Sequence, residues 1–204
     1  MAKETELVVA TRNQGKIAEI DRLLSSQLLD IKLRSVAEFE LADVEETGDS
    51  FEANALLKAH TIARATGRAA IADDSGIAVD YLGGAPGIFS ARWAGKHGDD
   101  RANIEKLLTE LIGVKTSDRT ARFVAVIALV RPDGAELVKR GELPGLVRNE
   151  PAGVNGFGYD PIFQPEGDSR TLAQMEPAEK DAISHRARAL RAITPLIAQF
   201  LGVQ

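Results

Sequence analysis

The chain lacks cysteine altogether, which excludes a disulfide framework, a thiolate nucleophile and a cysteine-ligated zinc. A protein without cysteine suits a reducing compartment, so we expect a cytoplasmic location. The segment 1–6 is polar and has no hydrophobic core of the kind that a secretory signal needs. Nothing in these features points to export.

The chain also lacks an excess of positive charge and any long apolar run. It carries 25 Lys and Arg against 30 Asp and Glu, a net charge of −5. This balance argues against a surface that binds nucleic acid. The longest strongly apolar run, residues 123–130, is far too short to span a bilayer. We therefore predict neither a nucleic-acid partner nor a membrane segment.

What is present is an ordinary globular composition. The 204 residues are 44% hydrophobic, enough to bury a substantial core in one large domain or in two tightly joined lobes. No internal repeat, low-complexity segment or long linker interrupts the chain. We expect a single domain over residues 1–204.

The hydrophobic pattern predicts a mixed sheet with helices packed against it. A buried-strand signal occurs at 7–10, and alternation of apolar and polar residues predicts a strand at 31–36. A long β-branched strand at 119–130 is followed by a hairpin turn and a returning strand at 135–142. Because this hairpin is antiparallel, a purely parallel sheet is disfavoured. The predicted fold class is α/β, mixed α+β.

Four helices are predicted between and after these strands. The first has an apolar face that includes Leu28, and the second follows a capping box at 49–52 and runs to about Arg64. The third starts at 99–101. The last begins near Pro177 and is expected to be kinked or interrupted at Pro195.

Two places in the sequence carry carboxylates. Asp73 and Asp74, followed by Ser75 and Gly76, lie between two apolar runs and predict a tight corner between two strands. Such a corner could hold a divalent metal or activate water, but taken alone these residues more often form a solvated turn. The loop at 43–49 contributes Glu45 and Glu46, and these acids could also be solvated loop charges.

Cations and backbone donors suited to phosphate occur in several separate places. Residues 11–16 join a strand to a helix, which is typical of an anion cradle, although the Walker A spacing is absent and an ordinary turn remains open. Lys58 and Lys180 are single lysines on helices, and residues 184–186 place three donors together. Each of these has a plain alternative as a surface group.

A loop rich in glycine and aromatics lies at 155–161. It could lay the Phe157 ring against a flat ligand, or its aromatics could fill the core. A triphosphate nucleotide would use all of these features together: cations for phosphate, oxygen ligands for a metal and a ring for the base.

In this order, the motifs resemble those of the inosine/xanthosine triphosphate pyrophosphatases, and the likeness covers nearly the whole chain. One small departure is Arg12, where many relatives have Gly or Ser. The motifs are Thr11-Arg12-Asn13-Gln14-Gly15-Lys16, Glu45-Glu46-Thr47-Gly48 with Asn54 and Lys58, Ala72-Asp73-Asp74-Ser75-Gly76, Gly83-Gly84-Ala85-Pro86-Gly87, Gly156-Phe157-Gly158-Tyr159-Asp160-Pro161 and Ser184-His185-Arg186.

The resemblance implies an elongated two-lobed fold, with a long mixed sheet, a central active-site cleft and a homodimeric assembly. It implies Mg²⁺-dependent hydrolysis of non-standard purine nucleoside triphosphates (ITP, dITP and XTP) to the monophosphate and pyrophosphate. This reaction would remove deaminated purines from the nucleotide pool.

The resemblance also implies roles for particular residues. Asp74 is expected to be the catalytic base, and Glu46 and Asp74 the metal ligands, with Glu45 and Asp73 as further candidates. Phe157 would stack on the base. The expected substrate-binding residues are Thr11, Arg12, Asn13, Gln14, Gly15, Lys16, Lys58, Ser75, Phe157, Gly158, Tyr159, Asp160, Lys180, His185 and Arg186.

Three rival interpretations remain. The first is a pyrophosphatase for modified pyrimidine triphosphates on a similar fold. The second is a nucleotide-sensing module without catalysis, which the intact set of acids and lysines disfavours. The third is a nucleic-acid-binding module, which the acidic net charge disfavours.

Overall fold

The computed structural model describes residues 5–24 and 31–203, and its main feature is a six-stranded sheet with the order β2-β1-β3-β4-β5-β6. β1 pairs in parallel with β2 and β3, whereas β5 and β6 are antiparallel, so the predicted mixed sheet is confirmed. The strands are β1 (Thr5–Val9), β2 (Ile31–Ser35), β3 (Ala69–Val79), β4 (Thr120–Val130), β5 (Glu136–Val147) and β6 (Phe163–Pro165).

The chain divides into two compact units. Unit 1 comprises residues 1–74, 125–141 and 186–204, and unit 2 comprises residues 75–124 and 142–185. Strands β3, β4 and β5 contribute residues to both units.

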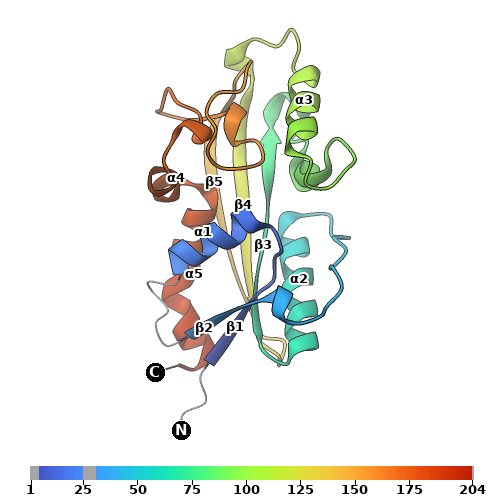
Figure 1. Cartoon of the computed structure of the whole chain (residues 1–204), viewed down its shortest axis with the longest axis vertical. Coiled ribbons are helices and arrows are strands. Elements are labelled where there is room, and N and C mark those ends of the chain that lie inside the picture. The colour runs from blue at the N-terminus through green and yellow to red at the C-terminus, as the bar shows by residue number, and fades with distance from the viewer. Residues whose placement is uncertain (1–4, 25–30, 204) are drawn as a thin grey trace. The chain divides into compact units, whose positions relative to one another are not determined.

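The core of unit 1 forms because alternate residues of its strands are apolar. Leu7 and Val9 of β1 pack with Ile71 of β3. On this side they meet the apolar stripes of α1 (Gln14–Leu24) and α5 (His185–Leu201). Figure 1 shows α2 (Phe51–Thr66) on the other side of these strands from α5. The strands of unit 1 are thus covered on both faces, as a largely parallel arrangement requires.

The core of unit 2 contains the other halves of the long strands. Ile77 and Val79 of β3 pack with Phe123 of β4 and with Leu107 of α3 (Asp100–Glu110). α3 begins where the sequence predicts, because Asp99 caps it by accepting a hydrogen bond from the Ala102 backbone N–H.

Two helix predictions need correction, and one lies outside the described residues. Ser50, not Asp49, caps α2. The C-terminal helix breaks at Ser184, between α4 (Pro177–Ile183) and α5. Pro195 lies inside α5, so the predicted interruption at Pro195 is wrong, and a kink there stays a prediction. Ser184 has extended backbone angles (φ −61°, ψ 154°), which end a helix wherever they occur. The predicted contribution of Leu28 to α1 falls outside the described range.

The predicted corner at residues 73–76 is wrong, because β3 runs without interruption from Ala69 to Val79. Gly76 serves close packing there. A Cβ built on Gly76 would lie 2.4 Å from Ser90 Oγ and 2.5 Å from the Gly87 carbonyl oxygen. Ser90 Oγ in turn accepts a hydrogen bond from the Ile77 backbone N–H at 2.9 Å. The glycine therefore lets the segment around Ser90 lie directly against the strand.

We expect Gly76→Ala to lower the free energy of unfolding by about 1–3 kcal/mol, because the Gly87 carbonyl belongs to the backbone and cannot swing away. Urea unfolding measures the change, and an m-value equal to that of the wild type would show that the native state is otherwise retained. An unchanged midpoint would contradict the close packing at Gly76.

Along residues 5–24 and 31–203, none of the helices combines the length and the apolar composition needed to cross a bilayer.

Candidate active site

Asp73 and Asp74 lie on opposite faces of β3, because successive side chains of a strand alternate. Asp73 is two residues beyond Ile71 and meets Lys16 of α1 and Arg186 of α5. Asp74 meets Lys58 of α2 on the other face. The expectation that a turn presents both acids side by side is therefore wrong. Each carboxylate has its own partners.

Asp73 belongs to a buried chain of alternating charges. The Lys16 Nζ lies 2.5 Å from Asp73 Oδ1, and Arg186 Nε donates to Asp73 Oδ2 at 3.0 Å. Arg186 Nη1 donates to Glu19, and Arg186 and Asp73 are each about 1% exposed. Glu19, Arg186, Asp73 and Lys16 together sum to zero net charge, which makes their burial tolerable.

The sequence analysis did not assign Glu19 to the site, although its position on α1 indicates that its side chain is buried. It lies three residues after Lys16 on α1 and falls on the helix face that carries the apolar Ile20 and Leu24. An acid on the buried face of an amphipathic helix indicates a buried counter-ion. Arg186, predicted for the base pocket, is held between Glu19 and Asp73.

The charges in this chain fix the ionisation of Asp73. Burial alone would raise the pKa of Asp73, but the positive charges of Arg186 and Lys16 hold it well below its usual range. Burial lowers the pKa of Lys16, and the charge of Asp73 opposes that change. Asp73 is therefore a permanent anion that keeps a cation beside the start of α1.

Asp74 has a different environment. Lys58 Nζ donates to Asp74 Oδ1 and to Glu46 Oε1, both at 2.8 Å, so one lysine brings two carboxylates together. Burial raises the pKa of Asp74. The charges of Lys58 and Lys16 oppose this rise, and that of Glu46 adds to it. Asp74 Oδ2 is buried and has no hydrogen-bond partner within the described ranges.

Glu46 and Asp74 could supply two of the oxygen ligands of a Mg²⁺ ion whose other ligands come from water and a bound phosphate. Among the described residues, no group of three or more His, Asp or Glu side chains is arranged to hold a metal. Mg²⁺ usually takes one or two carboxylates and completes its shell with water and substrate phosphates. The partnerless oxygen of Asp74 beside Glu46 matches that donor set.

The acidic loop before α2 is fixed by a residue that the sequence did not assign to the site. Asn54 is fully buried, and its Oδ1 accepts a hydrogen bond from the Gly48 backbone N–H at 2.8 Å. Asn54 and Lys58 are four residues apart and therefore share one face of α2. Glu45, in contrast, is exposed.

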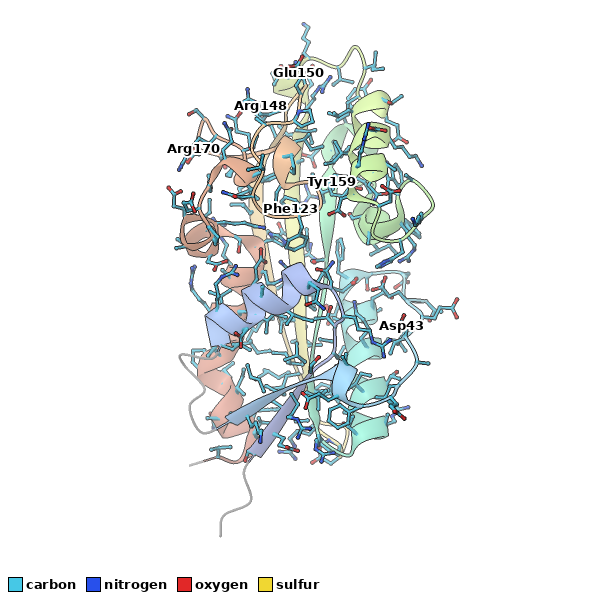
Figure 2. The ribbon with its side chains drawn as sticks, in the orientation of Figure 1. Asp43, Phe123, Arg148, Glu150, Tyr159 and Arg170 are labelled. Carbon is cyan, nitrogen blue, oxygen red and sulfur yellow. The ribbon has the colours of Figure 1, made fainter. Side chains whose placement is uncertain are left out.

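The segment 11–16 is organised around Asn13. Its Oδ1 accepts from the Lys16 backbone N–H at 3.0 Å, and Thr11 Oγ1 accepts from the Asn13 N–H at 3.2 Å. Gln14 and Gly15 are the first residues of α1, whose N-terminus favours an anion. The Arg12 side chain does not take part in this loop. Its Nη1 lies 2.7 Å from Oδ1 of Asp43, and Asp43 is labelled in Figure 2.

In unit 2, the segment 156–160, here called the aromatic loop, separates its two rings. Tyr159, labelled in Figure 2, belongs to the buried core, and burial raises the pKa of its phenol. Phe157 is half-buried and is not part of that core cluster. Lys180 Nζ lies 4.7 Å from the centre of the Phe157 ring and 2.5 Å from Asp160 Oδ2. Phe157 is therefore the more exposed of the two rings.

The remaining predicted residues of unit 2 are His185 and Ser75. The His185 ring is buried and stacks on Phe123, with ring centres 4.7 Å apart and planes 11° apart. Phe123 also contacts Phe163. Ser75 is a half-buried residue of β3. The structure thus brings Phe157, Asp160 and Lys180 together and places His185 against the aromatic core.

Comparison with known proteins gives one consistent relationship. The model described as the Ham1 family matches residues 7–196. A protein of Streptomyces avermitilis named dITP/XTP pyrophosphatase is 52% identical over 199 residues, covering 97% of this chain and 100% of the relative. A protein of the same name from Mycobacteroides abscessus is 48% identical over 202 residues, covering 97% of each.

Solved structures show the same relationship. The Ham1 protein of Staphylococcus aureus is 42% identical, with a TM-score of 0.85, and covers 96% of this chain and 100% of its own. A HAM1 protein from Coxiella burnetii is 44% identical, with a TM-score of 0.87, and covers 96% of this chain and 99% of its own.

Proposed function

The chain belongs to the Ham1 family, and we propose that it hydrolyses ITP, dITP and XTP to the monophosphate and pyrophosphate. The family match and the relatives named dITP/XTP pyrophosphatase confirm the resemblance to inosine/xanthosine triphosphate pyrophosphatases. Such a reaction removes deaminated purines from the nucleotide pool. The observation that carries the proposal is the pair of carboxylates, Asp74 and Glu46, joined by Lys58, with Asp74 Oδ2 left for a ligand.

Asp74 is the proposed base. Its raised pKa reflects a buried carboxylate that gains from accepting a proton, and its Oδ2 can take that proton from water. Water adds to phosphorus and the bond between the first and second phosphates breaks, giving the monophosphate and pyrophosphate. Lys58 and Lys16 supply fixed positive charge for the triphosphate. The N-terminus of α1, with Thr11, Asn13, Gln14 and Gly15, supplies backbone and side-chain donors.

Mg²⁺ is the proposed cofactor, with Glu46 and Asp74 as its protein ligands. When bound, it would neutralise phosphate charge and make water a stronger acid. Asp73 is less suited to this role than the sequence suggested, because Lys16 and Arg186 already bind both of its oxygens. We propose that Asp73 positions Lys16 instead.

We expect Glu46→Gln to raise the Mg²⁺ concentration for half-maximal turnover by about tenfold or more, because one of two carboxylates is lost. Glu45→Gln is the matched comparison, since Glu45 is the exposed neighbour, and its shift should stay below about threefold. Titrating pyrophosphate release against MgCl₂ measures both. A larger shift in Glu45→Gln than in Glu46→Gln would reverse the assignment.

The base pocket is proposed on the aromatic loop. The Phe157 ring would stack on the purine, with Gly158, Tyr159, Asp160 and Lys180 around it. Hypoxanthine and xanthine present a 6-oxo acceptor, for which His185 and backbone N–H groups are the candidate donors, since Arg186 already donates to Glu19 and Asp73. Adenine presents an amine there and would leave buried donors unpaired.

A substrate panel tests this function. Pyrophosphate release from ITP, XTP and dITP should exceed release from ATP, dUTP and methylated pyrimidine triphosphates by at least about tenfold, the scale of losing one buried hydrogen bond. A preference for pyrimidines would favour the rival specificity. Binding without any product would favour a sensing module.

The homodimer and the cytoplasmic location implied by the sequence are further proposals. Light scattering on the purified chain tests the first, and fractionation of cells that express it tests the second. The cleft expected between two lobes also stays a prediction.

A further inference from the structure

The aromatic loop places Phe157 between two glycines with left-handed backbone. Gly156 has φ +75° and Gly158 has φ +59°, so the chain turns sharply on both sides of the ring. A loop of this kind orients its ring only if its backbone is held in place. The contacts that hold it are therefore of functional interest.

Two of these contacts come from buried groups. Asp160 Oδ2 accepts a hydrogen bond from the Phe157 backbone N–H at 2.9 Å and is itself bound by Lys180. The Tyr159 hydroxyl donates to the Ser90 carbonyl at 2.9 Å, and both residues are buried. These contacts fix the residues on either side of Gly158.

The third contact comes from a different element. The Gly158 backbone N–H donates to Asp100 Oδ2 at 2.7 Å, and Asp100 is the first residue of α3, 58 positions earlier in the chain. Asp100 is not the cap of α3, because Asp99 performs that task by accepting from the Ala102 N–H. The two neighbouring aspartates thus have different partners: Asp99 caps α3, and the carboxylate of Asp100 binds the aromatic loop.

We propose that Asp100 is a positioning residue for the base: by holding the Gly158 backbone, it fixes the Phe157 ring in the orientation that stacks on a purine. This rests on the proposed function, in which Phe157 contacts the base. A carboxylate acceptor makes a stronger hydrogen bond to a backbone N–H than a neutral oxygen does. Asp100 touches neither phosphate nor metal in this account, so its effect is confined to ligands that carry a base.

Three variants test the proposal. Asp100→Ala removes the acceptor, Asp100→Asn keeps an acceptor oxygen, and Asp99→Ala removes the cap of α3 but leaves Asp100 in place. The readouts are kcat and KM for ITP, inhibition by IMP and by inorganic pyrophosphate, and exchange of the Gly158 amide hydrogen followed by NMR.

We expect Asp100→Ala to raise KM for ITP and the inhibition constant of IMP by roughly fivefold, with kcat within twofold. Inhibition by pyrophosphate, which has no base, should not change. Asp100→Asn should restore most of the loss. Asp99→Ala should lower Tm more than Asp100→Ala does, yet leave KM within twofold. The Gly158 amide should exchange faster in Asp100→Ala than in Asp100→Asn, and at the wild-type rate in Asp99→Ala.

Unchanged KM and IMP inhibition in Asp100→Ala would overturn the proposal, as would an equal loss of IMP and pyrophosphate binding. Either result leaves the proposed function standing, provided that the wild type hydrolyses ITP. A wild type that binds IMP but releases no pyrophosphate from ITP would instead refute the proposed function. The IMP and amide-exchange measurements would still decide the role of Asp100.

Discussion

Asp74→Asn is expected to lower kcat for ITP hydrolysis by about three orders of magnitude, within the range that a general base contributes. The substitution keeps the shape of the side chain but removes its ability to take a proton. Stability should change by less than about 1 kcal/mol, because burial already disfavours the charged form of Asp74 and Lys58 keeps Glu46 as a partner. The loss should therefore appear in a folded protein.

Steady-state release of pyrophosphate, together with urea unfolding, measures both quantities. Asp80→Asn is the matched control, because Asp80 pairs with Arg122 at an exposed position in unit 2. It should leave kcat within about twofold, as exposed pairs contribute little. Turnover of Asp74→Asn within tenfold of the wild type would remove Asp74 as the base.

Arg186→Met is expected to lower the free energy of unfolding by about 3–5 kcal/mol, the cost of removing the cation that two buried carboxylates share. Arg186 is fully buried and binds Glu19 and Asp73 at once. Methionine fills much of the space but carries no charge. Arg122→Met, at the exposed pair with Asp80, should cost no more than about 1 kcal/mol.

The loss in Arg186→Met should depend on pH in a defined direction. In the wild type the pKa of Asp73 lies below its unfolded value of about 3.9, so its pairing stabilises the fold above that pH and is lost as pH falls. Without Arg186, burial disfavours the charged form, and the variant is penalised wherever Asp73 must ionise. The difference between variant and wild type should therefore shrink as pH falls below about 4. A constant difference across pH would show that Arg186 acts through packing.

Much of the architecture could be predicted because it follows from local patterns. The stripe at Ile104 and Leu107, with an aspartate in front of it, is sufficient to place α3. The long apolar strand before the 131–134 turn is sufficient to place the hairpin. The break at Ser184 was missed because the side chains around it continue a helical pattern, and only the backbone shows the interruption.

The arrangement of the candidate site residues could not be predicted from the sequence. Asp73-Asp74-Ser75-Gly76 has the residues of a turn, and the groups that make it a buried strand come from afar: Lys16, Lys58 and Arg186 neutralise the acids. No local rule predicts a strand that buries two adjacent charges. Once the strand is continuous, alternation separates the two acids, so Asp73 and Asp74 cannot share one role.

The second limit is that supporting residues leave weak signals. Glu19 and Asn54 are polar residues on helices, and a sequence alone favours solvent exposure for both. The buried Glu19 is paired with Arg186, 167 positions away, and the buried Asn54 accepts a hydrogen bond from Gly48, six positions away. Asp100 likewise reaches Gly158 across 58 positions. Such contacts are decided by tertiary packing.

The most direct test of the account is the product of ITP hydrolysis by the purified wild type with Mg²⁺, resolved by anion-exchange chromatography. If Asp74, Glu46 and Lys58 form a pyrophosphatase centre, IMP and pyrophosphate should appear in equal amounts, and both should form about a thousandfold more slowly with Asp74→Asn. Formation of IDP and inorganic phosphate by the wild type, or undiminished IMP formation by Asp74→Asn, would contradict it.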